Sequence, residues 1–179
     1  MARILFRTPR LHCRHWRIED LDALHTVYSD PEAMRWVGDG QPIDRAACEA
    51  WFDMTQANYR TRGYGMFALE SLDSGALVGF CGLVHPGGQA EPEVKYAFLR
   101  SSWGLGLASE AVPALLAYGH EKHGLARIIA TVAPENLASQ RVLIKAGMWL
   151  VGQRQGEDGS LDTLYEWRAP DSASPRHYG

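Results

Sequence analysis

The chain has 179 residues, of which 46% are hydrophobic and 22% are charged, and these proportions suit one folded domain with a sizeable core. The net charge of -3 gives no reason to expect nucleic-acid binding, and no apolar run approaches the roughly 20 residues of a membrane span. The N-terminus also lacks the apolar core of a signal peptide, so we expect a cytoplasmic protein with no membrane or nucleic-acid partner.

The first half of the chain predicts a strand, three helices and two paired strands, in that order. They are expected over residues 10–16, 18–30, 31–37, 44–60, 64–71 and 76–84. Asp44 is a typical N-cap for the longest of these helices. The apolar face of that helix is expected to hold Ala47, Trp51, Met54 and Asn58. Leu72–Gly75 predicts a hairpin turn between the two strands.

The second half predicts alternating strands and helices. Strands are expected over residues 93–100, 127–132, 148–155 and 161–168, and helices are expected to begin near residues 106 and 136. Pro113 lies inside the first helix, so either that helix kinks or the Ser109 carbonyl finds another partner. Gly156–Ser160 predicts a second hairpin, and residues 169–179 are expected to be disordered. The order of elements predicts an α/β fold, with a mixed sheet and helices on both faces.

Three cysteines, Cys13, Cys48 and Cys81, are widely spaced, so neither a disulfide framework nor a zinc site is indicated. The run from His12 to His15 looks like a metal cluster. In a strand, however, alternate side chains face opposite sides, which separates His12 from His15. We therefore predict no metal site.

Residues 91–148 carry the most informative features. A strand leads into a turn with Gly104 and Gly106 that opens a helix, and a second strand leads to Pro134–Ser139 at the head of another helix. Such a turn lets backbone N–H groups point at a phosphate from a helix N-terminus, where the helix dipole favours anions. The pattern predicts a phosphate-bearing cofactor held between two strand–helix units. A tight turn with no ligand is the alternative, and a dinucleotide fingerprint fits poorly because Ser109 occupies the third glycine position.

Three segments carry a resemblance that extends from about Arg10 to Arg168: Asp-Pro-Glu-Ala-Met at 30–34, WGLGLASEA at 103–111 and PENLASQRVLIKAGM at 134–148. With these segments the chain resembles the GNAT superfamily of acetyl-CoA-dependent N-acetyltransferases. Within it, the chain is similar to the RimJ/RimL branch of ribosomal-protein N-terminal acetyltransferases. This resemblance implies a GNAT domain over residues 1–168, with a mixed and mostly antiparallel central sheet that splays between the parallel strands 93–100 and 127–132.

The resemblance also implies acetyl-CoA as cosubstrate and no metal. The pantetheine arm would lie in the splay, in contact with backbone groups of residues Phe98, Leu99 and Arg100. The pyrophosphate would be cradled by backbone N–H groups of Trp103, Gly104, Leu105 and Gly106. Asn136 and Ser139 match the Asn-x-x-Ser of the branch. Ser101 stands where the family often has Gln or Arg, so no side-chain role is implied there.

The family pattern suggests two catalytic residues. Leu143 stands where many members carry a tyrosine that protonates the departing thiolate, which makes Ser139 the candidate to hydrogen-bond the CoA sulfur. Glu93 lies on the strand where many members place a carboxylate base. A base is needed because an amine such as lysine, with a pKa of about 10.4, is mostly protonated at neutral pH.

Each assignment has a structural alternative. Asn136 could be only a helix N-cap, with Gly147 as the matching C-terminal glycine, and Ser139 could be a first-turn serine without chemistry. Glu93 could be a solvated charge at the strand edge or an ion-pair partner of Lys95 on the same strand face. Four further residues have two interpretations each. His85 is either an alternative base or substrate contact, or a surface loop residue. Tyr96 is either a packing or a substrate-lining residue, and Trp36 and Trp51 are either acceptor walls or core residues.

The predicted activity is acetyl transfer by direct attack of a primary amine in a ternary complex. The acceptor is either a protein N-terminus or a small molecule, and a homodimer is left open. A non-catalytic acyl-CoA-binding or sensing module on the same fold is the main alternative, and a nucleotide-binding enzyme of Rossmann type is a second.

Overall fold

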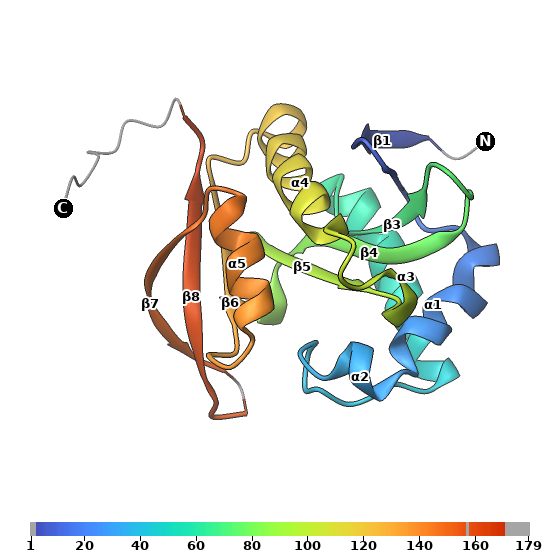
Figure 1. Ribbon diagram of the computed structural model, residues 1–179, viewed down its shortest axis with the longest axis horizontal. Helices are drawn as coiled ribbons and strands as arrows, with labels where there is room; N and C mark the ends of the chain where they lie inside the picture. Colours follow the sequence, from blue (N-terminus) through green and yellow to red (C-terminus); the bar gives the residue numbers. More distant parts are fainter. Residues whose placement is uncertain (1–2, 157, 171–179) are drawn as a thin grey trace.

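The computed structural model describes residues 3–156 and 158–170, which form one mixed sheet with helices on both faces (Figure 1). The strands are β1 Ile4–Arg7, β2 Leu11–Arg14, β3 Met66–Ser71, β4 Leu77–Val84, β5 Glu93–Phe98, β6 Arg127–Val132, β7 Trp149–Gln155 and β8 Leu161–Arg168. Their order across the sheet is β1-β2-β3-β4-β5-β6-β8-β7. Within the described residues, β5 and β6 form the one parallel pair. The predicted fold class is confirmed.

The helices cover the sheet from two sides. The α-helices are α1 Leu21–Tyr28, α2 Pro31–Met34, α3 Arg45–Arg62, α4 Leu107–His123 and α5 Leu137–Lys145, and the 3-10 turns are η1 Ile18–Asp20, η2 Pro86–Gly88 and η3 Arg100–Ser102. Strand β3 shows how the two layers arise. Phe67 and Leu69 pack into the cluster that contains α4 and α5, while Met66 and Ala68 pack into the cluster that contains α1 to α3. This alternation places an apolar core on each face.

The local signals near α3 were partly misleading. Asp44 caps the helix as predicted, because its carboxylate accepts the Ala47 N–H at 2.8 Å. The predicted apolar face was wrong in part: Trp51 packs against the core, but the buried residues are Cys48, Phe52 and Thr55, while Met54 is 66% exposed. The buried set has the same helical spacing as the predicted one, so packing against the sheet, and not periodicity, selects the face.

Strand β1, helix α4 and the two hairpins can also be compared with the sequence predictions. Strand β1 was not predicted, because its four residues are too few for an alternating pattern to be recognised. Helix α4 continues through Pro113, so the proline does not end it. Both predicted hairpins are confirmed by turn hydrogen bonds, Ser71 N–H to the Ala76 carbonyl and Gly156 N–H to the Ser160 carbonyl, each at 2.8 Å. Residue 157 and the predicted disordered segment beyond residue 170 lie outside the described residues.

None of the helices in the part of the chain that the structure describes has both the length and the apolar character needed to cross a membrane.

Candidate active site

The central sheet opens between β5 and β6. The two strands share one paired position, Glu93 with Ile129, and the Ile129 N–H donates to the Pro92 carbonyl at 2.9 Å. Beyond it the strands diverge, which confirms the predicted splay (Figure 1). The divergence opens a cleft of about 440 Å³, lined by residues 94–98 of β5, 130–132 of β6 with Ala133 after it, and the first turns of α4 and α5. A missing stretch of ladder leaves backbone N–H and C=O groups available to a strand-like ligand.

The glycine turn lies at one end of this cleft. Gly104 and Gly106 have φ angles of 74° and 76°, in the left-handed region that favours glycine. Gly106 precedes α4 as its N-cap, without a side-chain cap. Within the described residues, the N–H groups of residues 104–106 donate to no backbone acceptor, and those of the first turn of α4 have no partner within the helix. The turn and the helix N-terminus therefore present free donors and a favourable dipole to an anion.

A cation that sequence reasoning missed lies beside this turn. Arg10 follows β1 in the chain, and its guanidinium donates to the Glu110 carboxylate at 3.0 Å on the first turn of α4. A terminal nitrogen of Arg10 would lie 3.5 Å from a β-carbon at Gly106. No local signal could have linked residue 10 to residue 106, because the sheet brings them together.

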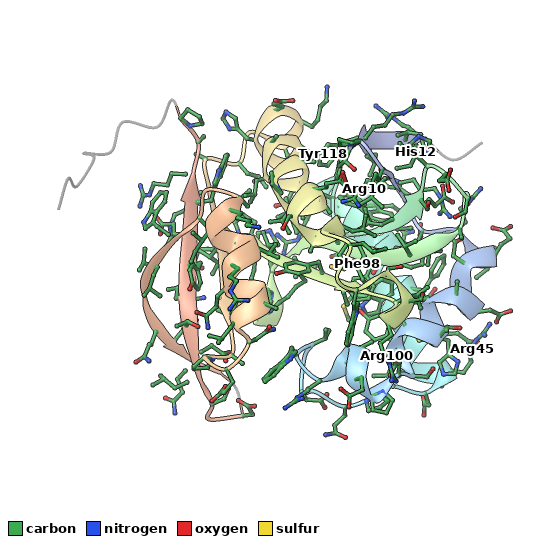
Figure 2. The ribbon with its side chains drawn as sticks, in the orientation of Figure 1. Arg10, His12, Arg45, Phe98, Arg100 and Tyr118 are labelled. Carbon is green, nitrogen blue, oxygen red and sulfur yellow. The ribbon has the colours of Figure 1, made fainter. Side chains whose placement is uncertain are left out.

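The segment between β5 and α4 is held by several polar contacts. Figure 2 shows Phe98 at the end of β5 and Arg100 extending toward α2. The Trp103 indole N–H donates to the Phe98 carbonyl at 2.9 Å, and the Leu99 N–H donates to Val78 at 2.9 Å. The Phe98 carbonyl and the Leu99 N–H are therefore already hydrogen-bonded within the protein. Leu105, also in the predicted cradle, is exposed.

Arg100 connects the cofactor side of the cleft to α2. Its guanidinium donates to both oxygens of Asp30, which also accepts the Glu32 N–H as N-cap of α2. The hydrogen bond from Arg100 lowers the pKa of Asp30 below its ordinary value. The side chain of Arg100 thus fixes α2, which contributes Glu32 and Ala33 to the cleft wall, with Trp36 following on the next loop.

At the head of α5, Asn136 and Ser139 both line the cleft. The Asn136 side chain caps the helix by accepting the Ser139 N–H at 3.2 Å, so the capping alternative is confirmed. The hydroxyls of Ser139 and Tyr96 are 2.5 Å apart. Burial raises the pKa of Tyr96, against a smaller lowering by the Ser139 hydrogen bond. Leu143, the position without a tyrosine, is buried in the core that borders the cleft.

Glu93 lies at the point where the sheet begins to open and is buried. Its Oε1 accepts from Lys95 at 2.6 Å and from the Thr131 hydroxyl, and its Oε2 accepts from Gln89 at 3.1 Å. The predicted pairing with Lys95 is confirmed. A carboxylate offers about four acceptor positions, so three donors leave one position on Oε2. Lys95 lines the cleft itself.

Three other candidates resolve into structural or wall residues. Trp36 is 44% exposed and lines the cleft, whereas Trp51 packs with Trp16, Tyr28 and Phe80 in the second core. The His85 ring is hydrogen-bonded to the Tyr64 hydroxyl at 2.8 Å and to the Gln89 carbonyl at 3.0 Å. With both ring nitrogens engaged, His85 supports the loop before β5.

An acidic residue not singled out from the sequence lies near Glu93. Burial raises the pKa of Asp162 on β8, and the opposing attraction of Lys95 is smaller.

As for metals, no group of three His, Cys, Asp or Glu side chains that could hold an ion is found among residues 3–156 and 158–170. Cys13 is buried, and that burial raises the pKa of its thiol.

Comparison with known proteins gives these observations a family context. The family model of the acetyltransferase (GNAT) domain matches residues 10–149. The uncharacterized N-acetyltransferase p20 of Bacillus licheniformis is 32% identical over 139 residues, which span 76% of this chain and 77% of that protein. An acetyltransferase from Agrobacterium tumefaciens has a TM-score of 0.79 at 26% identity, covering 92% of this chain and 94% of the other.

RimL, a ribosomal L7/L12 α-N-protein acetyltransferase whose structure is in complex with coenzyme A, also has a TM-score of 0.79. It is 16% identical, and the match covers 93% of this chain and 98% of the RimL chain. At this identity the likeness shows a shared fold and no more.

Proposed function

Because the chain belongs to the GNAT acetyltransferase family, we propose that it transfers the acetyl group of acetyl-CoA directly to a primary amine. The observation that supports this best is the cleft between β5 and β6, which ends at the free N–H groups of the glycine turn. An extended pantetheine arm suits the unpaired strand edges, and a pyrophosphate suits the turn and the N-terminus of α4. The complex of RimL with coenzyme A, on the same fold, supports this placement.

In this proposal each residue has a separate role in the reaction. Glu93 acts as general base through its remaining acceptor position, directly or through one water, which is worth roughly 10²–10⁴-fold in rate. A backbone N–H of the open strand edge stabilises the oxyanion that forms on the thioester carbonyl. Ser139 hydrogen-bonds the sulfur as the C–S bond breaks. Gly104, Gly106 and their neighbours hold the cosubstrate without taking part in bond changes.

The acceptor enters beside α2 in this proposal, where Trp36 and Lys95 line the cleft. A protein N-terminus would match the acceptor class named for RimL, and a small amine would use the same attack geometry. We assign the chain to the RimJ/RimL-like branch on its Asn136 and Ser139, and leave the choice of acceptor to the activity screen described below.

A non-catalytic acyl-CoA-binding module is the second candidate. Two observations favour it: Leu143 is buried where many family members carry the acid, and Glu93 is already hydrogen-bonded to three donors. Such a module would bind acetyl-CoA and CoA but would release no thiol in the presence of amines.

Calorimetric titration with acetyl-CoA, CoA, NAD and ATP tests the binding step. We expect binding of acetyl-CoA and CoA, with no binding of NAD and ATP. A panel of amines, including amino acids, polyamines and peptides with free N-termini, then tests turnover by release of the CoA thiol. Absence of binding to both CoA species would overturn the proposal, and binding without thiol release for any amine would favour the non-catalytic module.

A further inference from the structure

The contact between Tyr96 and Ser139 joins two elements that meet in the cleft. Tyr96 lies in the middle of β5, and Ser139 lies on the first turn of α5, 43 residues later. Their hydroxyl oxygens are 2.5 Å apart, and both residues line the cleft. The Tyr96 ring packs against the core beneath α4 and α5. The ring is therefore fixed, and its hydroxyl is held at Ser139.

The direction of this hydrogen bond decides what Ser139 can do. Each hydroxyl carries one proton and can also accept. If Ser139 donated to Tyr96, its proton would be used within the protein. If Tyr96 donates, Ser139 keeps its own proton for a group in the cleft. A phenol is a much stronger acid than an aliphatic alcohol, so in a bond between these two hydroxyls the Tyr96 phenol is the better donor, and burial raises its pKa, which keeps that proton in place at neutral pH.

We propose that Tyr96 is a positioning residue for acyl transfer, whose hydroxyl donates to Ser139 Oγ and so directs the Ser139 proton at the sulfur of CoA. The inference rests on the proposed function. In the step concerned, the amine nitrogen bonds to the carbonyl carbon and the C–S bond breaks. The electron pair goes to sulfur, where the Ser139 hydroxyl stabilises the negative charge. The base takes one proton from the amine, and the released thiolate takes one from solvent.

This arrangement accounts for Leu143. That position lies one helical turn after Ser139 and is 1% exposed, packed in the core. A phenol from α5 is therefore absent, while β5 brings a phenol to the neighbouring serine from across the cleft. The single hydroxyl of a tyrosine at position 143 is therefore replaced by two hydroxyls, that of Tyr96 and that of Ser139, which faces the sulfur.

The test compares Tyr96→Phe, Ser139→Ala and the double variant. Tyr96→Phe keeps the ring and removes only the hydroxyl, so we expect kcat to fall about tenfold while affinity for acetyl-CoA stays within twofold. Ser139→Ala should lower kcat at least as much, and the double variant should be no slower than Ser139→Ala, because the two hydroxyls act as one unit.

Tyr118→Phe is the matched control. Tyr118 is a buried tyrosine on α4 whose hydroxyl bonds the His123 ring at 3.2 Å, and it does not line the cleft. It should lose as much thermal stability as Tyr96→Phe and keep full turnover.

The pKa of the bound CoA thiol, followed by thiolate absorbance, gives a readout that does not depend on turnover. We expect this pKa to rise in Tyr96→Phe, because the hydrogen bond to the thiolate is no longer oriented. Full kcat in Tyr96→Phe, or effects of Tyr96→Phe and Ser139→Ala that multiply in the double variant, would overturn the inference while leaving the proposed function intact. Failure of the wild-type protein to bind CoA would instead overturn the proposed function.

Discussion

Two buried charged groups in this molecule are satisfied in different ways. Arg14, on β2, is 2% exposed, and its guanidinium donates four hydrogen bonds, one to Glu70, two to Asp20 and one to the His15 carbonyl, with a further ion-pair contact to Glu70 at 2.6 Å. Glu93, on β5, is also 2% exposed, but its three donors leave one acceptor position. The first cluster lies where β2 and β3 are fully paired, and the second lies where the sheet opens.

The difference separates a cluster whose hydrogen-bonding capacity is filled from one that keeps an acceptor position. A buried charge with every hydrogen bond made has no capacity left for a ligand, and it contributes mainly by not being left unpaired. Glu93 is not among the residues that line the cleft, but its partner Lys95 is, and a buried carboxylate with spare capacity at such a place can exchange a proton with a bound molecule, directly or through a water. The comparison therefore predicts that changes at Arg14 lower stability, whereas changes at Glu93 lower turnover.

Arg14→Met should have the largest effect on stability. Removing the guanidinium leaves the Glu70 and Asp20 carboxylates without their main partner, which typically costs about 3–5 kcal/mol. Denaturant unfolding followed by tryptophan fluorescence measures this loss. A decrease below about 1 kcal/mol would show that the cluster is not the stabilising element proposed here.

Glu93→Gln should act on turnover instead. The amide keeps the shape but cannot take a proton, so kcat should fall by roughly a hundredfold or more while binding of acetyl-CoA is retained. Glu70→Gln is the matched control, because it makes the same change in the closed cluster and should lower stability with kcat preserved. Equal kcat for wild type and Glu93→Gln would remove Glu93 from the chemistry.

Gly106→Val sharpens the comparison on the cofactor side. A β-branched residue at φ 76° strains the turn that carries the free N–H groups, so we expect affinity for acetyl-CoA to fall at least tenfold, or about 1.4 kcal/mol. Gly75→Val is the control, since Gly75 has φ 69° in the hairpin between β3 and β4 and has open space around it. Both variants should lose similar stability, and calorimetry should show weaker binding in Gly106→Val alone.

Local sequence signals predicted the parts of this molecule that depend on neighbours in the chain. The caps at Asp44 and Asn136 and the glycine turn each follow from a few adjacent residues, and the resemblance to the family supplied the splay. The α3 face was wrong because two adjacent stripes of the helix are equally periodic. Periodicity gives the element, and packing gives its orientation.

Contacts between distant residues could not be predicted in this way. Arg14 meets Glu70 across 56 residues, and Tyr96 meets Ser139 across 43, because strand order brings them together. Tyr96 was noted from the sequence only as a packing or substrate-lining residue. Its partner became visible once β5 and α5 were placed on the two sides of the cleft.

Asp162 offers the smallest and most specific test, since it lies close to Lys95 and Glu93. Its pKa is raised above the usual 3.8, so the native state favours the protonated form. Because the native pKa is raised, protonated Asp162 stabilises the native state at low pH, and this contribution is lost as the pH rises through the native pKa. At neutral pH the ionised carboxylate is unfavourable, so Asp162→Asn should raise the thermal midpoint by about 1–2 °C, with no gain below pH 3.8. Asp158 is the opposite case, because hydrogen bonds from Ser160 lower its pKa. Asp158→Asn should therefore lower the midpoint slightly at neutral pH, and a shift of the same sign in both variants would contradict the assignment.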